Sequence, residues 1–450
     1  MARSGLVALA LLAGAVGATY LNALFGAFQF DDYNAIVHNP AVHSWSAYVA
    51  SMPGIRPLLK LSYTFNWMSG LGLLGFHLFN VLCHAANVVC VFALWRRQSA
   101  WLGERARDVW PVALTAALLF GLHPAQTEAV TYLSGRSVSL MGLFYLGAIL
   151  AYVQGGERGS RLWQQGLSSV LFGAALMVRE TAWTLPFALL LWDRRAAELR
   201  WPARLWRLRA HWAVLILAAV EMLSTSGYRR LLVVSLTTRT LRENLLTQVD
   251  GILYLVTQPL LLLRLNIDPD LPVRTSLSPA LALKAAILLA LLILGILQLR
   301  RRPWLGGGML WMLLHLVPTN SFLPRLDVAN DRQLYLALIG PAVIVSTFFW
   351  DRLSRPMAVA ATLSLALCLS VATVARNREY RTEVSLWQAT VQRSPDKARA
   401  WNNLGYAYQL EGDVAAARAA YGRALALDPN YQKARANAAS LPSSGTSVSK

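Results

Sequence analysis

Two adjacent carboxylates, Asp31 and Asp32, stand just after a long apolar run at 5–28. That run is long enough to span a hydrocarbon core of about 30 Å, so the two acids stand where a helix leaves the membrane. Neighbouring carboxylates disfavour each other's negative charge, and one of them therefore accepts a proton from a hydroxyl more readily. The pair predicts a general base or a metal ligand at the membrane surface. The alternative is a solvated cap of the first helix.

A further acid, Glu128, lies in the segment "HPAQTE", which joins two apolar runs. His123 precedes it and Arg136 follows it on the same side of the membrane. Ionisable residues gathered at one membrane face cost free energy to keep there, so they usually mark a functional site. We therefore predict that Glu128 is catalytic and that His123 lines the site. As an alternative, His123 before Pro124 simply ends a helix.

Arginines on this face predict a phosphate group in the substrate. Basic residues normally collect in cytoplasmic loops, so arginines on the opposite face need a reason. The planar guanidinium fork binds phosphate through paired hydrogen bonds, while anchoring to lipid headgroups is the alternative. The predicted phosphate-binding residues are Arg56, Arg136 and Arg332. Residues predicted to line the site are Arg179, Glu180 and Asn330, with a local ion pair between Arg179 and Glu180 as the alternative.

The elements that must position these residues are membrane-spanning helices. Hydrophobic residues make up 56% of the 450 and charged residues 14%, whereas about a quarter of a soluble domain is charged. The net charge is +19, and the basic residues stand in short clusters between apolar runs. This pattern indicates topology signals and contact with anionic lipids rather than binding of nucleic acid. We expect an all-α polytopic membrane protein with about eleven spans. The apolar runs lie at 5–28, 76–95, 109–123, 137–153, 162–178, 182–192, 211–226, 281–299, 304–318, 334–350 and 357–374.

Clusters of arginine predict which ends of these helices face the cytoplasm. They include Arg96 and Arg97, 300–302, and the pair Arg352 and Arg355. All of them can be cytoplasmic only if the further segment 247–265, which is broken by Pro259, does not cross the membrane completely. The predicted membrane domain is then 1–375. Its large first loop, 29–75, and everything after 375 lie on the outer face.

The composition becomes that of a soluble protein after residue 375. The segment "ARAWNNLGYAYQLEGDVAAARAAYGRALALDPN" from Ala398 fits the 34-residue tetratricopeptide pattern. A helix at 383–393 supplies half of an earlier repeat. Fewer than three repeats rarely hold together alone, so this repeat module, 376–440, is expected to lean on the membrane domain. Residues 441–450 are predicted to be a disordered tail.

A polar stripe runs along the second apolar segment. Its members recur every three or four residues and so share one helix face. Buried amides and imidazoles in membranes commonly hydrogen-bond across to neighbouring helices, and we favour that structural role. The stripe consists of His77, Asn80, His84 and Asn87.

Several segments, taken in order, resemble a known family. They are "FQFDDYNAIVHNPAV", "RPLLKLSYTFNW", "FHLFNVLCHAANVV", "LFGLHPAQTEAVTYLSGRSVSLMGLFYLGAILAY", "RETAWTLPFALLLWD" and "DRQLYL". With the repeat that follows, they are similar to the transmembrane and TPR-containing protein O-mannosyltransferases, and more broadly to GT-C membrane glycosyltransferases. The resemblance covers nearly the whole chain. It departs in the short repeat array and in Arg179–Glu180, where the family is expected to carry Lys–Glu.

The resemblance implies a GT-C-like bundle and transfer of a sugar from a polyprenyl-phosphate donor to a protein or envelope acceptor, with inversion at the sugar carbon. It implies that Asp31 is the base, that Asp32 assists, and that Glu128 and Arg332 match further site positions. No nucleotide-binding motif is required, because the leaving group is a lipid phosphate, and a divalent metal remains an option. The implied partners are the lipid-linked donor, the acceptor and membrane lipids.

Two other classes of protein fit parts of the sequence. One is a non-catalytic anchor that displays the repeat module, and the other is a transporter of lipid-linked saccharides. A transporter would carry charges near mid-membrane along a path, whereas here they gather at one face. Only five of the 42 basic residues are lysine, which favours a GC-rich bacterial genome. We therefore expect an inner-membrane protein whose site and repeat module face the periplasm.

Overall fold

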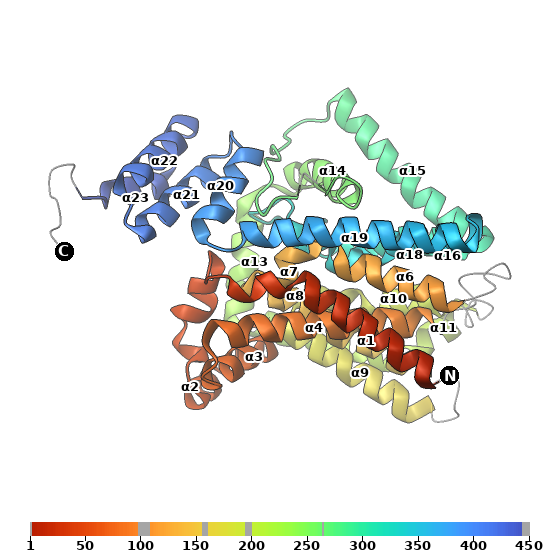
Figure 1. Ribbon diagram of the computed structural model, residues 1–450. Helices are drawn as coiled ribbons and strands as arrows, with labels where there is room; N and C mark the ends of the chain where they lie inside the picture. The colour runs from red at the N-terminus through yellow and green to blue at the C-terminus, as the bar shows by residue number, and fades with distance from the viewer. Residues whose placement is uncertain (1, 98–108, 155–160, 194–199, 263–264, 443–450) are drawn as a thin grey trace.

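A computed structural model describes residues 2–97, 109–154, 161–193, 200–262 and 265–442, and helices are the only regular secondary structure in these ranges. Figure 1 shows their order along the chain. The membrane domain contains α1 (Ala2–Thr19), α2 (Trp45–Ala50), α3 (Pro57–Met68), α4 (Gly72–Trp95), α6 (Val109–Leu122), α7 (Thr127–Val130), α8 (Arg136–Gln154), α9 (Arg161–Val178), α10 (Leu185–Trp192), α11 (Trp201–Arg207), α12 (Arg209–Ser224), α13 (Ser226–Thr238), α14 (Leu241–Thr257), α15 (Pro279–Arg301), α16 (Pro303–Leu316), α17 (Leu334–Ala337), α18 (Ile339–Arg352) and α19 (Arg355–Glu379). The repeat module contains α20 (Glu383–Arg393), α21 (Ala398–Glu411), α22 (Val414–Leu427) and α23 (Gln432–Ala439).

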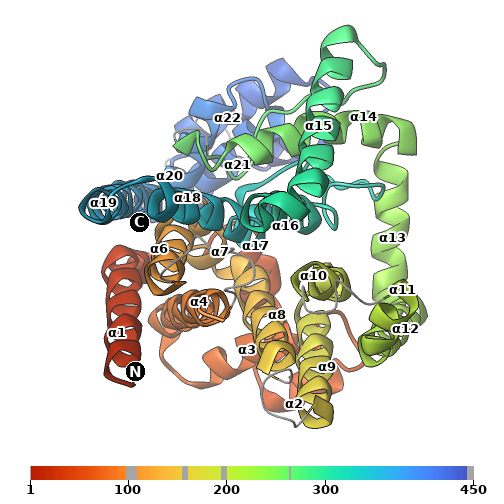
Figure 2. The same ribbon diagram turned by 90° about the vertical axis from the view of Figure 1, so that its right-hand side faces the viewer.

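The long helices run side by side, and the two ends of the bundle differ. In the end-on view of Figure 2, α4 lies among α1, α6 and α8, and it packs against all three. The repeat module sits at one end of the bundle, and the turns between α15 and α16 and between α18 and α19 lie at the other (Figure 1). Those turns hold the arginine clusters at 300–302 and 352–355. The basic clusters and the repeat module therefore lie at opposite ends.

Apolar helices make this an integral membrane protein. Four described helices are long and apolar enough to cross a membrane: Gly72–Trp95, Leu133–Gln154, Pro279–Arg301 and Arg355–Glu379. The number rises to seven if each of three bent helix pairs is one span. Every predicted span contains a helix, but some, such as α10 and α16, are short. By length and composition the described residues thus support four to seven crossings, and the count of about eleven stays a prediction.

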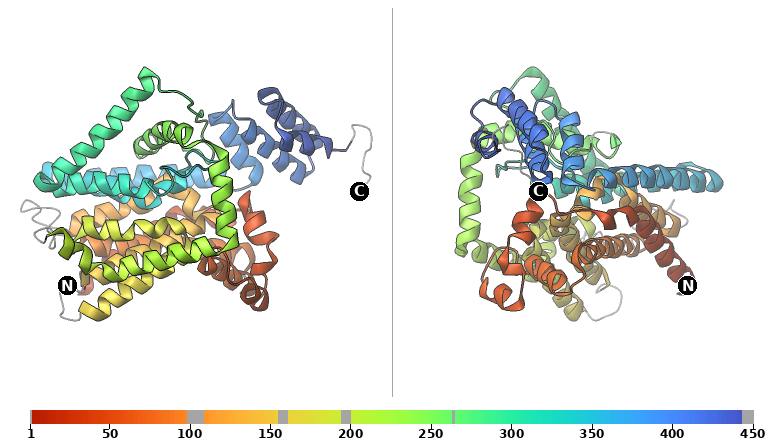
Figure 3. Two further views of the ribbon diagram at one scale, coloured as in Figure 1. Left: turned by 180° about the vertical axis from the view of Figure 1, so that it is seen from behind. Right: turned by 60° about the vertical axis from the view of Figure 1, so that its left-hand side comes forward.

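The segment predicted not to cross, 247–265, lies largely in α14. This helix is not among the candidate spans in the described residues, and it points across the direction of α19 in Figure 1. Its buried Asp250 forms ion pairs with Arg274 and Lys284, with N–O distances of 2.7 and 2.5 Å. Seen from behind in Figure 3, α13 likewise runs crosswise, at the end of the bundle that carries the repeat module.

Hydrogen bonds of the polar stripe on α4 confirm its predicted structural role. Each member is buried and bonds to a backbone oxygen of another segment. These hydrogen bonds connect α4 to neighbouring segments at several points along its length. The hydrocarbon core of a membrane offers no competing hydrogen-bond partners. The contacts are His77 Nε2 with Gly26 O at 3.2 Å, Asn80 Nδ2 with Val130 O at 3.1 Å, His84 Nε2 with Gly121 O at 2.9 Å, and Asn87 Nδ2 with Ser139 O at 2.8 Å.

The repeat module packs on the membrane domain, as predicted. Within the module, a Cβ on Gly405 would lie 2.6 Å from the ring of Tyr421, so α21 and α22 can approach this closely only with glycine there. Towards the membrane domain, the buried ring of Trp387 meets Phe30 edge to face, with ring centroids 5.2 Å apart. α19 continues past the expected boundary at 375 to Glu379. Of the predicted tail, 443–450 lies outside the described residues.

Candidate functional site

The two adjacent acids have different surroundings. Asp32 is fully buried, and its Oδ1 accepts hydrogen bonds from Ser134 N at 2.7 Å and Ser134 Oγ at 2.5 Å. Its Oδ2 accepts from Gln29 N at 3.0 Å. Burial raises the pKa of Asp32 to about 7 against the opposing effect of these hydrogen bonds. Asp32 therefore ties the first loop to the turn before α8 and is shielded from solvent.

Asp31 is half-buried, and its carboxylate forms no hydrogen bond or ion pair with any residue that the structure describes. Its backbone N–H donates to the buried hydroxyl of Tyr132 at 3.0 Å. The preceding Phe30 has a left-handed φ of 46°, and its N–H donates to Glu383 Oε1 of the repeat module at 3.2 Å. Of the two acids, Asp31 is thus the one whose carboxylate is not already engaged by hydrogen-bond donors of the described residues.

Glu128 and Arg332 form the centre of the site. The short helix at Pro124–Gln126 leads into α7, which carries Glu128 at 1% exposure. Glu128 Oε2 accepts from the backbone N–H of Arg332 at 3.0 Å, and Oε1 lies 3.4 Å from Arg332 Nε. Asp327 Oδ2 lies 3.7 Å from Arg332 Nη2. With its amide oxygen turned toward Arg332, Asn330 accepts from Nε and Nη2 at 3.3 Å each. Arg332 is therefore held from several sides.

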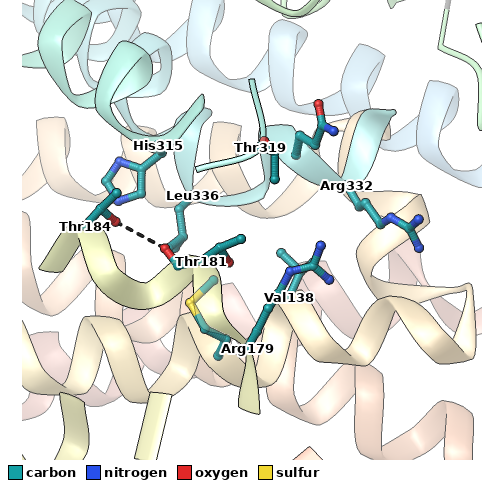
Figure 4. A pocket seen from close by; sticks show the side chains of 10 residues that line it. Val138, Arg179, Thr181, Thr184, His315, Thr319, Arg332 and Leu336 are labelled. Atoms are coloured by element: carbon teal, nitrogen blue, oxygen red, sulfur yellow. Dashed lines mark hydrogen bonds between the residues drawn. The ribbon is translucent and has the colours of Figure 1, made fainter. Parts of the chain in front are cut away.

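A pocket opens beside Arg332, between α8, α16, α17 and the turn after α9. Figure 4 shows the guanidinium groups of Arg179 and Arg332 on the same side of this pocket, with threonine hydroxyls and His315 further along it. Asp31 is not among the residues that line this pocket, and its charge acts on Arg332 more weakly than those of Glu128 and Asp327. The lining residues are Val138, Met141, Arg179, Thr181, Thr184, His315, Thr319, Arg332, Gln333 and Leu336.

Around this pocket, the positive charge of the arginines exceeds the negative charge of the carboxylates that face them. Arg179 is buried and donates to Ser137 Oγ at 2.7 Å, but no carboxylate among the described residues pairs with it. Burial lowers the pKa of Arg179, and the nearby guanidiniums of Arg56, Arg325 and Arg332 lower it further. Because a guanidinium stays charged in proteins, such a cluster attracts an anion. A phosphate group meets that need.

Glu180 pairs with Arg56 and not with its sequence neighbour Arg179. Arg56, at φ 52° before α3, forms a two-pronged ion pair with Glu180, in which Nε lies 2.9 Å from Oε2. Burial would raise the pKa of Glu180, but Arg56 outweighs burial and lowers that pKa to about 2. The alternative prediction of a local ion pair between Arg179 and Glu180 is therefore wrong. Because Arg56 already binds Glu180, it has fewer N–H donors left for a phosphate than the sequence indicates.

Arg136 does not reach the pocket, and its surroundings argue against the predicted phosphate contact. It is fully buried, and each of its guanidinium nitrogens donates to the protein. The acceptors are Asn80 Oδ1 at 2.6 Å, Ser62 O at 3.1 Å and Phe76 O at 2.9 Å. The rings of Tyr63, Phe76 and Phe79 lie 4.3–5.3 Å from the guanidinium carbon. Arg136 therefore joins α3, α4 and α8 as a structural group.

His123 ends a helix in the way that its alternative interpretation expected. Nδ1 accepts from Ala125 N at 3.1 Å and Nε2 lies 3.3 Å from Pro259 O, so both ring nitrogens are occupied. For a metal, the described residues contain no group of three or more His, Cys, Asp or Glu side chains that could hold one.

Sequence reasoning missed much of the pocket wall. No sequence motif points to three of the residues that line the pocket, Thr181, Thr184 and His315. They line it only because the chain folds them next to α8 and α17. Asp327 stands in the polar segment before Arg332, where the density of polar side chains at one membrane face was a usable signal. Tyr132, which binds the backbone of Asp31, follows Glu128 closely and carried no such signal.

Comparison with known proteins shows a distant similarity over most of the chain. A family model described as "Tetratricopeptide repeat" matches residues 398–431. The chain is 25% identical over 443 residues to "Protein O-mannosyl-transferase F38B6.6" of Caenorhabditis elegans, covering 92% of this chain and 62% of that protein. It is 26% identical over 463 residues to "Protein O-mannosyl-transferase TMTC3" of Mus musculus, covering 89% and 49%. A shorter match, 32% identical over 185 residues, is to "Protein O-mannosyl-transferase Tmtc1" of Drosophila melanogaster, covering 37% and 20%.

The chain spans about half of TMTC3 and 62% of the nematode protein. All three of these relatives are described as protein O-mannosyl-transferases. With nearly the whole chain aligned to two of them and the repeat matched separately, the protein is a distant homologue of the TMTC-type protein O-mannosyltransferases.

Proposed function

We propose that the protein is a membrane glycosyltransferase that transfers mannose from a polyprenyl-phosphate donor to a protein hydroxyl. One observation carries the proposal. Arg332, held by Glu128, shares a pocket with Arg179, whose guanidinium pairs with no carboxylate among the described residues. The charge of Asp31, whose carboxylate has no partner among these residues, also acts on Arg332. A phosphate-binding group and a free base therefore occur together at one end of the bundle. Names of the relatives support mannose and a protein acceptor.

In the proposed reaction the lipid phosphate binds at Arg179 and Arg332 while the lipid tail stays in the bilayer. Asp31 takes the proton of the acceptor hydroxyl as its oxygen attacks the anomeric carbon. The bond from that carbon to the phosphate oxygen breaks, and the electron pair leaves with the lipid phosphate. Arg179 and Arg332 stabilise the charge that develops on it. Attack opposite the leaving group inverts the sugar carbon.

Asp32 and Glu128 act in this scheme as positioning groups. Asp32 anchors the loop that carries Asp31 through its bonds to Ser134 and Gln29. Glu128 orients Arg332 through its contacts with the backbone N–H and Nε of that residue. A base that works at a fixed depth needs such rigid support, since a misplacement of about 1 Å can cost on the order of a hundredfold in rate.

The proposal includes a GT-C-like bundle of about eleven spans with the site on the non-cytoplasmic face. Separation of the arginine-rich turns from the repeat module in Figure 1 supports this orientation. In a bacterial inner membrane, which the low share of lysine favours, the site and the repeat module would face the periplasm. The repeat module is proposed to help recognise the acceptor, because helical repeats offer extended binding surfaces.

A transfer assay with purified protein tests the function. Radiolabelled polyprenyl-phosphate mannose is incubated with the protein and an acceptor peptide rich in serine and threonine, and label in the peptide is counted. We expect transfer by the wild type and by Asp351→Asn, a control at the far end of the bundle. Arg332→Ala should weaken donor binding by at least about tenfold, as loss of a charged hydrogen-bonding group implies. Donor binding unchanged by Arg332→Ala would refute the proposed site.

A further inference from the structure

Basic side chains of the repeat module reach the loop that holds Arg332. Arg399 on α21 places Nη2 2.6 Å from Asp327 Oδ1, and its Nε lies 2.7 Å from Asp268 Oδ2. The other oxygen of Asp327 lies 3.7 Å from Arg332 Nη2. Asp327 is therefore shared between a guanidinium of the repeat module and one of the candidate site, and it lies much nearer the former.

A second chain of ion pairs ends at the neighbouring residue. Arg393 on α20 contacts both carboxylate oxygens of Glu379, at 2.5 and 2.6 Å. Glu379 also pairs with Arg376, whose Nη2 lies 3.5 Å from Asp331 Oδ2. Both chains start in the repeat module and converge on Asp331 and Arg332.

We propose that Arg399 is a positioning residue of the donor-phosphate site, acting through Asp327 on Arg332. The inference rests on the proposed function, because it assigns Arg332 to the lipid phosphate. It makes the repeat module part of the donor site's scaffold, in addition to any part it has in acceptor recognition.

Competition between two guanidiniums for one carboxylate explains the effect. Arg332 already faces Glu128 and would be largely neutralised if Asp327 also closed onto it. Arg399 draws Asp327 away and leaves the charge of Arg332 available to an anion in the pocket. Asp327 and Arg399 are only partly exposed, at 22% and 27% of their side-chain surface, so solvent screens this attraction incompletely.

Binding of a short-chain polyprenyl phosphate to the full-length protein in detergent tests the proposal. Arg399→Gln should raise its Kd about three- to tenfold, in the range of coupling between contacting charged groups. Arg399→Lys should restore most of the affinity. Lys397→Gln is the matched control, since Lys397 pairs with Asp268 at 2.5 Å but not with Asp327. It should bind like the wild type.

A second substitution separates positioning from mere attachment of the module. Adding Asp327→Asn to Arg399→Gln removes the carboxylate that would close onto Arg332, so it should restore binding toward the wild-type Kd. A loss of binding in Arg399→Gln that Asp327→Asn does not restore, or an equal loss in Lys397→Gln, would overturn the proposal in favour of simple docking. Wild-type affinity in Arg399→Gln would overturn it outright.

The outcome for Arg332→Ala tells the two proposals apart. If Arg332→Ala loses binding while Arg399→Gln does not, the donor site stands and only the role of Arg399 is wrong. If Arg332→Ala binds normally, the proposed function itself fails.

Discussion

Replacing Asp31 by asparagine should abolish most turnover while leaving the fold intact. The carboxylate of Asp31 makes no hydrogen bond or ion pair with a described residue, so an amide of the same size breaks no contact there. We therefore expect a change in stability within about 0.5 kcal/mol, as for surface substitutions. The bond from its backbone N–H to Tyr132 does not depend on the side chain.

The expected loss of rate follows from the role of a general base. Such groups contribute about 10²–10⁴-fold, or roughly 3–5 kcal/mol of activation free energy. Donor affinity should stay the same or rise slightly, because Asp31→Asn removes a negative charge within range of the arginine that binds the phosphate. A reduced kcat with an unchanged or lower KM for the donor is thus the signature.

Single-turnover transfer from a radiolabelled donor, at saturating acceptor, measures this step directly. Thermal unfolding of the same preparations provides the control for folding. Turnover of Asp31→Asn within threefold of the wild type would refute the assignment of the base. An inactive but stably folded Asp32→Asn beside an active Asp31→Asn would reverse the roles of the two acids.

Three further predictions follow from the structure. Burial raises the pKa of Asp32 to about 7 in the folded protein, from about 4 in an unfolded chain, so between these pH values the folded state binds one more proton and its stability falls as the pH rises. The melting temperature of the wild type should therefore drop relative to that of Asp32→Asn between pH 5 and pH 8. Parallel melting curves of the two proteins would contradict this. Arg136→Met should destabilise the protein by about 1–3 kcal/mol for each buried acceptor that it leaves unpaired on Asn80, Ser62 and Phe76. The donor Kd of the remaining folded protein should be unchanged, and an altered Kd would return Arg136 to the phosphate site. In a cysteine-free background, Gly445→Cys should react with a membrane-impermeant maleimide in intact spheroplasts, whereas labelling only after permeabilisation would invert the topology.

The sequence by itself determined the helical membrane architecture, the repeat module and the polar stripe. These features depend on hydropathy and on periodicities of a few residues, which are local properties of the chain. Glu128 and Arg332 could also be assigned to one site from their motifs, although they are far apart in the sequence, and they pair in the structure. The number of crossings was harder to predict, because helices such as α10 and α16 are too short to be judged by length alone.

Only the tertiary structure decided which partner each charged group takes. Asp31 and Asp32 are neighbours in the chain, but packing buries the carboxylate of Asp32 and leaves that of Asp31 without a partner among the described residues. Glu180 pairs with the distant Arg56 and not with the residue beside it. Arg399 reaches Asp327 because the repeat module folds back against the membrane domain. An ion pair depends on distances of a few ångströms between segments remote in sequence, and no local pattern encodes those distances.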